Sequence, residues 1–517
     1  MNQTKDKSVI DSKFLQACDI PLEPSQVEPF TLVIFGGAGS LAKLKLIPNL
    51  FQLFRNKDLP ESFTILGAGR TDYNDAGYRA LMKKAVAQVA GEAFSEAQWE
   101  DFSSHLYYLS GNVEAEEGMK QLSARIEQLA PKTAKGTTEV VYYMAVPPEV
   151  TPRIVSNLKC RNMCKGTFST KIIVEKPFGV NRATAQALNE IIRQAFDENQ
   201  IYRIDHYLAK EPVQNILFFR FSNSIFEQLW NTRYIESVQI TVAEDAGIAH
   251  RGEFYEQAGV VRDIVQNHIL QLVSVIAMEP PVGFNADFVR DEKLKVMRAI
   301  RPMDQAAIDR FTVRGQYASG SVNNASVPGY RNESKVSATS LAPTFFAGKF
   351  FIDNLRWASV PFYVRTGKRL KKNITEICLE FKQLPLRLFG RTCDAIEPNV
   401  LILTIQPDEK ICLRFGVKYP YAQNQLSMES MTFSYREAFQ KPLQGAYERL
   451  LLDCLNGDLS LFVRQDMVEV MWEIVDPIIA RWDSAPPTDF PNYAAGTWGP
   501  EAASRLLAQD GHHWITE

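Results

Sequence analysis

The chain has 517 residues, 45% of them hydrophobic, and a formal net charge of −3. A nearly neutral chain has no overall positive field, so we expect neither nucleic acid nor a membrane surface as a partner. The apolar runs are too short to span a bilayer, and the polar first 28 residues do not resemble a signal peptide. Seven scattered cysteines fit a reducing compartment, so we expect a cytoplasmic protein.

The first 200 residues alternate between short apolar runs and helical patterns. After a loose extension over residues 1–28, five runs predict strands: from Thr31 to the glycines, Phe63–Gly69, Val140–Val146, Lys171–Glu175 and Ile201–Ile204. A helical stripe follows the first strand, and Pro48 within it predicts a kink or a later helix start. This alternation predicts a Rossmann-type parallel α/β domain over residues 29–204.

The pattern changes after Asp205. One long helix is predicted over Tyr255–Met278. Apolar runs joined by turn residues predict strands at Val238–Ala243, Ile377–Phe381, Val400–Ile405 and Ile411–Phe415. We therefore expect a C-terminal α+β domain over residues 205–517 with a large, mainly antiparallel sheet.

The turn after the first strand has the pattern G-x-x-G-x-x-A, formed by Gly36, Gly39 and Ala42. Small residues there let the backbone approach a pyrophosphate, and the following helix presents free N–H groups to it. The pattern departs from the commoner G-x-G-x-x-G, and a purely structural turn is the alternative. Its place between a buried strand and a helix favours a dinucleotide site.

The second strand ends in L-G-A-G-R-T, which places Arg70 where an NAD site usually has Asp or Glu. A guanidinium suits the 2′-phosphate of NADP because it can hydrogen-bond two phosphate oxygens. Asp72 nearby leaves NAD open as a weaker alternative, and an ordinary surface arginine is the other interpretation.

Two strand ends and one helix contain the candidate chemical groups. Lys176 follows one predicted strand, and the next strand is followed by Asp205, His206, Tyr207 and Lys210. The cations and the phenol could hold a phosphate, although a solvated polar loop is the alternative. Cys160 and Cys164 have no second pair to complete a zinc site, so we expect thiols and no metal.

His268 lies on an apolar face of the long predicted helix. Such a histidine is usually a satisfied core residue, but beside a carboxylate it can be a general base. Asp263 and Asn267, four residues apart, are expected to share a helix face, and Asp263 could bind a sugar hydroxyl.

Several motifs together resemble the glucose-6-phosphate dehydrogenase family. They are G-G-A-G-S-L-A-K, V-E-K-P-F-G, R-I-D-H-Y-L-A-K-E, A-G-V-V-R-D-I-V-Q-N-H, V-P-F-Y-V-R-T-G-K-R-L, Y-E-R-L-L-L-D-C-L-N-G-D and G-T-W-G-P. The resemblance extends from about Thr31 to Trp514. It implies oxidation of glucose 6-phosphate at C1 to a lactone, hydride transfer to NADP, a place in the oxidative pentose phosphate pathway, and a homodimer or homotetramer.

The resemblance also implies a role for each matching residue. His268 would be the general base, Asp205 would orient it, and Lys176 would place the substrate against the nicotinamide. Substrate contacts are implied for His206, Tyr207, Lys210, Glu244, Asp263 and Lys368. Cofactor contacts are implied for Gly36, Gly39, Ser40, Leu41, Arg70, Pro147 and Lys176.

Three positions depart from the family pattern: Ser40 replaces an Asp, Ala209 a Gly and Asn373 a basic residue, with Lys372 beside it. One alternative function is an E-K-P-containing NAD(P) oxidoreductase that acts on an unphosphorylated sugar. Another is a catalytically inactive NADP(H)-binding sensor. The presence of both His268 and Asp205 argues against the sensor, because a sensor is free to lose them.

Overall fold

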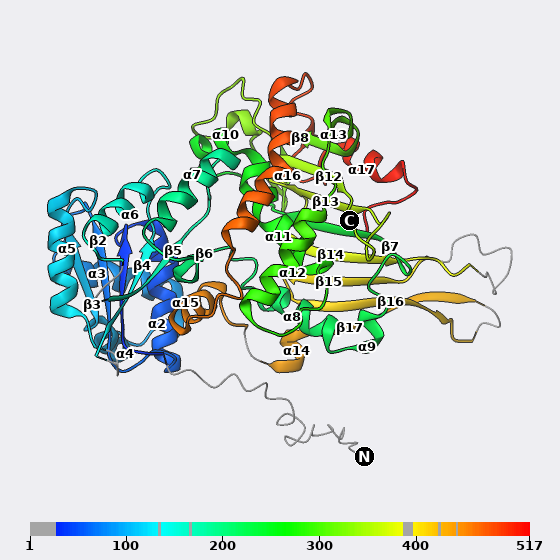
Figure 1. The fold of residues 1–517 in the computed structure, drawn as a ribbon. Coiled ribbons are helices and arrows are strands. Elements are labelled where there is room, and N and C mark those ends of the chain that lie inside the picture. Colours follow the sequence, from blue (N-terminus) through cyan, green and yellow to red (C-terminus); the bar gives the residue numbers. More distant parts are fainter. Residues whose placement is uncertain are drawn as a thin grey trace, which may run out of the picture.

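The computed structural model describes residues 27–132, 136–164, 168–385, 397–421, 425–440 and 443–516. Except for its last two residues, the extension predicted over 1–28 lies outside them. Two large sheets with their covering helices make up the molecule (Figure 1). In the described part of the chain, no helix combines the length and the apolar character that a membrane crossing requires.

The first sheet is parallel throughout, with strand order β3-β2-β1-β4-β5-β6. Its strands are β1 Phe30–Phe35, β2 Phe63–Gly69, β3 Leu106–Ser110, β4 Thr138–Met144, β5 Phe168–Val174 and β6 Ile201–Arg203. The helices between them are η1 Ala42–Leu46, α2 Ile47–Asn56, α3 Asp75–Ala90, η2 Gly91–Ala93, α4 Glu96–Ser103, α5 Glu116–Leu129, α6 Thr151–Cys160, α7 Arg182–Arg193 and η3 Glu198–Gln200. This order confirms the predicted Rossmann-type architecture.

Local details of this half differ from the prediction. Helical backbone begins at Ser40, passes through the π-helical turn η1 and continues as α2, so Pro48 follows a change of winding and the later helix start is not observed. Strand β4 ends two residues earlier than predicted, because the Ala145 N–H turns back to the Tyr143 carbonyl. Strand β3 was not predicted.

The second sheet has the order β17-β16-β15-β14-β7-β13-β12-β8 and is antiparallel except for the pair β7 and β13. Its strands are β7 Ile235–Ala243, β8 Thr312–Gly315, β12 Phe345–Phe350, β13 Phe362–Gly367, β14 Ile374–Phe381, β15 Val400–Gln406, β16 Lys410–Lys418 and β17 Leu426–Ser434. Four short strands lie outside it: β9 Tyr317–Ala318, β10 Gly320–Val322, β11 Ala325–Val327 and β18 Tyr493–Ala494. The four runs predicted as strands fall within β7, β14, β15 and β16, which confirms the mainly antiparallel sheet.

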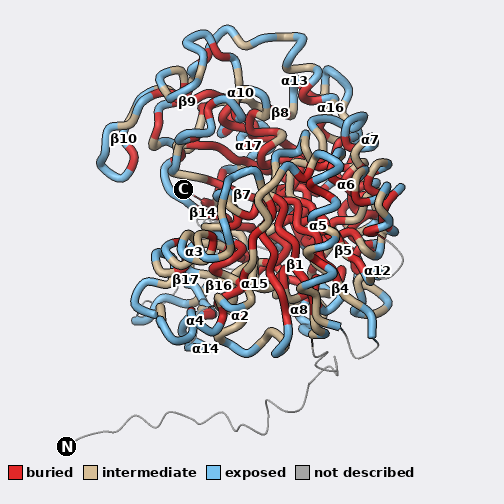
Figure 2. Tube along the Cα trace, turned by 90° about the vertical axis from the view of Figure 1, so that its left-hand side faces the viewer, coloured by how far each residue is buried: buried red, intermediate tan, exposed pale blue. Residues whose placement is uncertain are grey.

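The helices of this half are α8 Glu211–Phe221, α9 Ser224–Glu227, α10 Gly252–Val260, η4 Val261–Ile269, α11 Leu270–Ala277, α12 Ala286–Ala299, α13 Gln305–Phe311, η5 Tyr330–Asn332, α14 Tyr435–Phe439, α15 Ala446–Asn456, α16 Gln465–Ser484 and α17 Glu501–Ala508. The sheets and the helix segments against them contain most of the buried residues (Figure 2). Helix α15 packs back against α2, and its Leu450, Leu451 and Cys454 belong to the core of the first sheet. The chain therefore returns to the first sheet after the strands of the second sheet are complete.

The single helix predicted over Tyr255–Met278 is wrong. Gly259 has φ 57° and ψ 179°, which ends α10, and the next nine residues form the π-helix η4 before α11 continues. Gly259 allows this bend because glycine adopts positive φ without steric cost. The break matters because Asp263 and His268 lie within η4.

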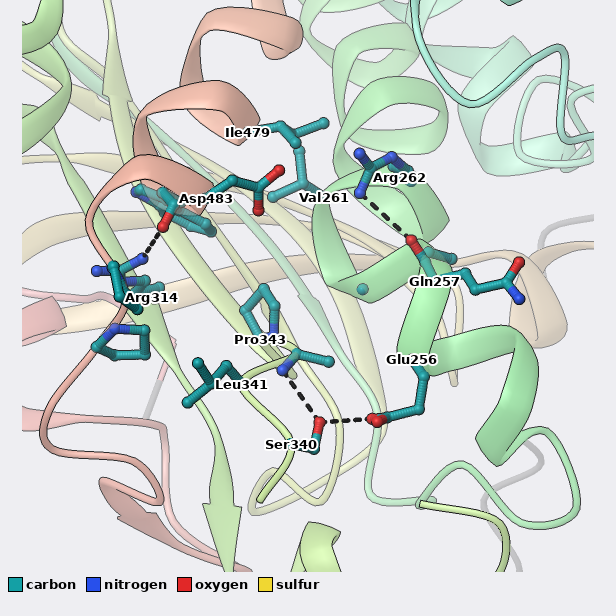
Figure 3. Close-up of a pocket in the computed structure, with 16 residues that line it drawn as sticks. Glu256, Gln257, Val261, Arg262, Arg314, Ser340, Leu341, Pro343, Ile479 and Asp483 are labelled. Atoms are coloured by element: carbon teal, nitrogen blue, oxygen red, sulfur yellow. Dashed lines mark hydrogen bonds between the residues drawn. The ribbon is translucent and has the colours of Figure 1, made fainter. Parts of the chain in front are cut away.

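The kink borders a cavity of about 450 Å³ between α10, η4, the loop before β12 and the end of α16 (Figure 3). Arg262 and Arg314 line it together with Glu256 and Asp483, so its charges balance. None of the residues predicted for the functional site lines this cavity.

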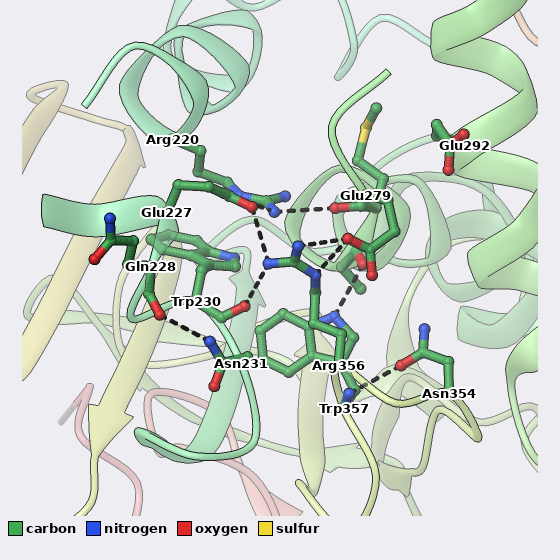
Figure 4. Close-up of polar contacts among 12 residues, drawn as sticks. Arg220, Glu227, Gln228, Trp230, Asn231, Glu279, Glu292, Asn354, Arg356 and Trp357 are labelled. Carbon is green, nitrogen blue, oxygen red and sulfur yellow. Dashed lines mark hydrogen bonds and ion pairs between the residues drawn. The ribbon is translucent and has the colours of Figure 1, made fainter. Parts of the chain in front are cut away.

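Buried polar groups hold the C-terminal end of α11 (Figure 4). The fully buried Arg220 donates to the carbonyl oxygens of Val275, Ile276 and Met278 over 2.9–3.1 Å and pairs with Glu227 at 3.2 Å. The indole of Trp230 donates to the Ile276 carbonyl at 2.9 Å. These donors satisfy carbonyls that a helix end otherwise leaves without partners.

We expect Arg220→Met to destabilise the protein by about 3–5 kcal/mol, because it leaves three buried carbonyl oxygens without their donor and leaves Glu227 paired only with Arg356. Arg301→Met is the matched control, since the Arg301–Asp353 pair is about half exposed and should contribute about 0–1 kcal/mol. Denaturant unfolding followed by tryptophan fluorescence measures both. Equal midpoints for the two variants would contradict the assignment.

Candidate active site

The register of the first sheet brings two of the predicted residues together. Val174 at the end of β5 pairs with Arg203 at the end of β6. Lys176 and Asp205 each lie two residues further on, so both emerge at the same carboxyl edge. Ligands bind at this edge in open parallel sheets.

The parallel pair of the second sheet provides two more groups in the same way. Ala243 of β7 is level with Gly367 of β13, and the next residues are Glu244 and Lys368. These two side chains form a short ion pair, and Lys368 Nζ also lies 3.3 Å from Asp263 Oδ2. The chemical groups of the second half therefore face the edge that carries Lys176.

His268 and Asp205 form a buried dyad. The Nδ1 atom of His268 lies 2.6 Å from Asp205 Oδ1, which also accepts from the Tyr207 backbone N–H at 3.0 Å. Nε2 of His268 faces Lys176 Nζ at 2.9 Å. Because Nδ1 donates to the carboxylate, Nε2 has the lone pair and is the atom able to accept a proton.

Burial and neighbouring charges set the protonation states. Burial lowers the pKa of His268 and outweighs the opposing effect of Asp205. Burial alone would raise the pKa of Asp205, but His268 holds it below its ordinary value. The dyad at neutral pH is therefore a carboxylate beside a neutral imidazole, the state that a general base requires.

Asp263 lies beside this dyad between two lysines, Lys176 and Lys368. Its Oδ1 is 3.6 Å from Lys176 Nζ, and its backbone carbonyl accepts from the same ammonium at 2.9 Å. Burial opposes ionisation, but Lys176 and Lys368 lower the pKa of Asp263 to about 2. Asp263 is therefore a fixed acceptor suited to a hydroxyl group.

The residues predicted to hold a phosphate pack on the His268 ring and on one another. The Tyr207 ring stacks on the His268 ring with centroids 4.2 Å apart, and the His206 ring lies 4.5 Å from it. Lys210 Nζ lies 3.9 Å from the centre of the Tyr207 ring. Burial lowers the pKa of His206 to about 2, so Lys210 provides the positive charge in this group.

The glycine turn has the geometry of a phosphate cradle. Gly36 has φ +81°, and a Cβ there would lie 2.3 Å from the Ala145 carbonyl oxygen. Gly37, which was not predicted, is as restricted, because its Cβ would lie 2.5 Å from Gly67 Cα. The turn lies between β1 and β4, where the strand order reverses, and this fits a pyrophosphate at the helix start.

The other predicted cofactor residues surround this turn. Gly39 and Ser40 are exposed, and Leu41 is half-buried at the start of the helix. Arg70 is exposed at the end of β2 and makes no ion pair within the described residues. Pro147 is exposed three residues after β4. A dinucleotide with a 2′-phosphate fits these groups.

Glu175 is a residue of this site that sequence reasoning missed. Its Oε1 accepts from Tyr143 of β4 at 2.6 Å and from Tyr447 of α15 at 3.1 Å. Burial raises the pKa of Glu175. The contact fixes the residue before Lys176 to both halves of the chain, and the E-K-P and Y-E-R-L motifs are the sequence signal that could have found it.

Among the described residues, the group with metal-ligand spacing is Asp205, His206 and His268, whose ligand atoms lie within 4.8 Å of one another. These residues are the His268–Asp205 dyad and the adjacent His206. The Lys176 ammonium at 2.9 Å from His268 Nε2 opposes a cation there. Cys160 and Cys164 are not part of such a group.

Comparisons with known proteins cover nearly the whole chain. Residues 33–215 match the model "Glucose-6-phosphate dehydrogenase, NAD binding domain", and residues 217–515 match the C-terminal domain model of that family. The glucose-6-phosphate 1-dehydrogenase of Bacillus subtilis (strain 168) is 40% identical over 493 residues, 95% of this chain and 99% of the relative. That of Treponema pallidum (strain Nichols) is 42% identical over 494 residues, 94% of this chain and 95% of the relative.

Two solved structures are similar to this chain over nearly its whole length. A glucose-6-phosphate dehydrogenase in complex with its substrate glucose-6-phosphate has a TM-score of 0.85 and 33% identity, covering 95% of this chain and 100% of that chain. The Mycobacterium avium glucose-6-phosphate 1-dehydrogenase has a TM-score of 0.80 and 34% identity, covering 94% and 98%.

Proposed function

The chain belongs to the glucose-6-phosphate dehydrogenase family, and on this premise we propose that it oxidises glucose 6-phosphate at C1 to 6-phosphogluconolactone with NADP. The observation that carries the proposal is the buried His268–Asp205 dyad, whose second ring nitrogen, Nε2, contacts Lys176. The reaction needs a base at C1 and an aligned cofactor, and this cluster lies at the sheet edge that supports both.

His268 Nε2 takes the proton of the C1 hydroxyl as the hydride leaves C1. Asp205 keeps Nδ1 protonated and stabilises the imidazolium that forms, as carboxylates do in other histidine-based sites. Lys176 and Asp263 hold the sugar beside Nε2, and Glu244 with Lys368 completes the hydroxyl contacts. This arrangement removes the proton without a metal ion.

Lys210, Tyr207 and His206 bind the phosphate of the substrate. Lys210 supplies charge, and the phenol and imidazole supply hydrogen bonds. This group distinguishes the proposal from an oxidoreductase for unphosphorylated sugars, which has no use for it. Ala209 is fully buried beside Lys210, so the departure from Gly at this position adds no exposed group.

NADP, when bound, accepts the hydride. Gly36, Gly39, Ser40 and Leu41 hold its pyrophosphate, and Pro147 with Lys176 lies at its nicotinamide end. Arg70 binds the 2′-phosphate and favours NADP over NAD.

We further propose that residues 29–204 form the dinucleotide-binding domain and residues 205–517 the substrate domain.

We also propose that the protein is a cytoplasmic homodimer or homotetramer that associates through the eight-stranded sheet. Met431 and Phe433 of the edge strand β17 are 63% and 41% exposed, which supports association at this edge. Light scattering coupled to size exclusion measures the oligomeric state.

Absorbance of NADPH after mixing the purified protein, glucose 6-phosphate and NADP tests the activity. Rapid formation with the phosphorylated sugar alone supports the proposal, and parallel reactions with NAD and with free glucose measure the two specificities. NADP binding without turnover on any hexose phosphate would replace the proposal with the sensor.

We expect the KM for glucose 6-phosphate to rise as the pH passes about 8, with less change in kcat. Burial lowers the pKa of Lys210 to about 8, so this cation loses its proton and its attraction for phosphate above that pH. Lys210→Arg should remove the rise, because a guanidinium stays charged. An unchanged rise in that variant would assign it to another group.

A further inference from the structure

The winding of η4 brings Asp263 and His268 onto one face. In a π-helix, hydrogen bonds join residues five apart, so such residues lie nearly over one another. In an α-helix, with about 3.6 residues per turn, the same two residues would be about 1.4 turns apart and face different directions. Lys176 Nζ lies 2.9 Å from His268 Nε2 and 3.6 Å from Asp263 Oδ1, so both side chains do face one site.

The Asn267 side chain turns back into this helix. Its Nδ2 donates to the Arg262 carbonyl at 3.1 Å, and its Oδ1 accepts from the His268 backbone N–H at 2.7 Å. Asn267 is 4% exposed, so these bonds form away from solvent. The Asn267 amide therefore binds the helix backbone, whereas the Asp263 carboxylate faces Lys176 and Lys368.

The hydrogen bond from the His268 N–H to Asn267 Oδ1 also affects the Asp263 carbonyl. That carbonyl lies five residues before His268 and is the acceptor that π-helical winding gives to its N–H. Lys176 Nζ donates to this carbonyl at 2.9 Å. The Asn267 amide thus offers the His268 N–H a second acceptor while Lys176 binds the Asp263 carbonyl.

We infer that Asn267 is a positioning residue, whose amide holds the π-helical turn that sets His268 Nε2, the Asp263 carboxylate and Lys176 in one cluster. The inference rests on the proposed function, since it assigns Asn267 a part in the same hydride transfer. Misplacing reacting groups by about 1 Å can cost about 100-fold in rate.

Asn267→Leu tests the inference because leucine has a similar volume but forms neither of the two side-chain hydrogen bonds of Asn267. The His268 N–H can return to the Asp263 carbonyl, so we expect the protein to fold. We expect kcat to fall by about 10- to 100-fold, with an unchanged Kd for NADP. The primary isotope effect with glucose 6-phosphate deuterated at C1 should rise, because the chemical step becomes rate-limiting.

Gln266→Leu is the matched control. Gln266 is also buried in η4, and its Nε2 has no hydrogen-bond partner in the described part of the chain. We expect this variant to keep the wild-type kcat and isotope effect. Equal losses in Asn267→Leu and Gln266→Leu would show only that the helix tolerates no change, and would overturn the inference.

Amide hydrogen exchange of the peptide over residues 261–269, without substrate, gives a readout that does not depend on turnover. We expect faster exchange in Asn267→Leu than in the wild type and in Gln266→Leu. If Asn267→Leu does not fold, Asn267→Ala decides by the same measurements. Unchanged exchange and kcat in a folded variant would overturn the inference, whereas an inactive wild type would overturn the proposed function alone.

Discussion

Replacing His268 by asparagine is expected to lower kcat for glucose 6-phosphate by about 10²- to 10⁴-fold, the contribution of a well-placed general base. Asparagine can still hydrogen-bond Asp205, but no basic nitrogen remains where Nε2 faces Lys176 at 2.9 Å. The KM should change less, because a base acts mainly in the transition state.

His105→Asn is the matched control for this experiment. His105 precedes β3 at the amino edge of the first sheet, and its Nδ1 contacts the Phe63 carbonyl at 2.9 Å. We expect that variant to keep wild-type kcat. Turnover of folded His268→Asn within a few-fold of the wild type would remove His268 from the role of base and return it to the core residue that its apolar helix face also predicts.

The positions of Lys176 and Asp205 could be predicted because each follows a buried apolar run, and the ends of parallel strands share one edge. The register that sets Val174 against Arg203 depends on pairing between distant segments, so no local pattern shows it. The return of α15 to the first sheet is of the same kind, since its Leu450 and Cys454 fit any buried helix face. Family resemblance, rather than periodicity, identified Glu244 and Lys368.

The π-helix shows a different limit of sequence reasoning. Val261, Ile264 and His268 follow an α-helical stripe closely enough to hide a change of winding, and only Gly259 signalled a break. With α-helical spacing, Asp263 and His268 would face different directions; with the observed winding, both face Lys176. The side chains at the site were therefore predictable, whereas their mutual orientation was not.

Replacing Asp205 by asparagine is expected to lower kcat on the order of 100-fold, less than the roughly 10⁴-fold loss that a wrong histidine tautomer causes in a Ser-His-Asp triad. Oδ1 of Asp205 accepts from both His268 and the Tyr207 N–H, so the amide oxygen should take this place and preserve the tautomer. The amide nitrogen then takes the place of Oδ2, which has no hydrogen-bond partner within the described residues.

The pH profile of Asp205→Asn separates the lost charge from a lost orientation. The Asp205 carboxylate raises the pKa of His268 against the larger effect of burial, so removing the charge should move the acid limb of kcat/KM to lower pH while the plateau falls. Asp309→Asn, which changes a surface carboxylate paired with Arg481, should leave both unchanged. A lower plateau with an unmoved acid limb would mean that Asp205 acts by orienting the ring and that its charge contributes little to the basicity of His268.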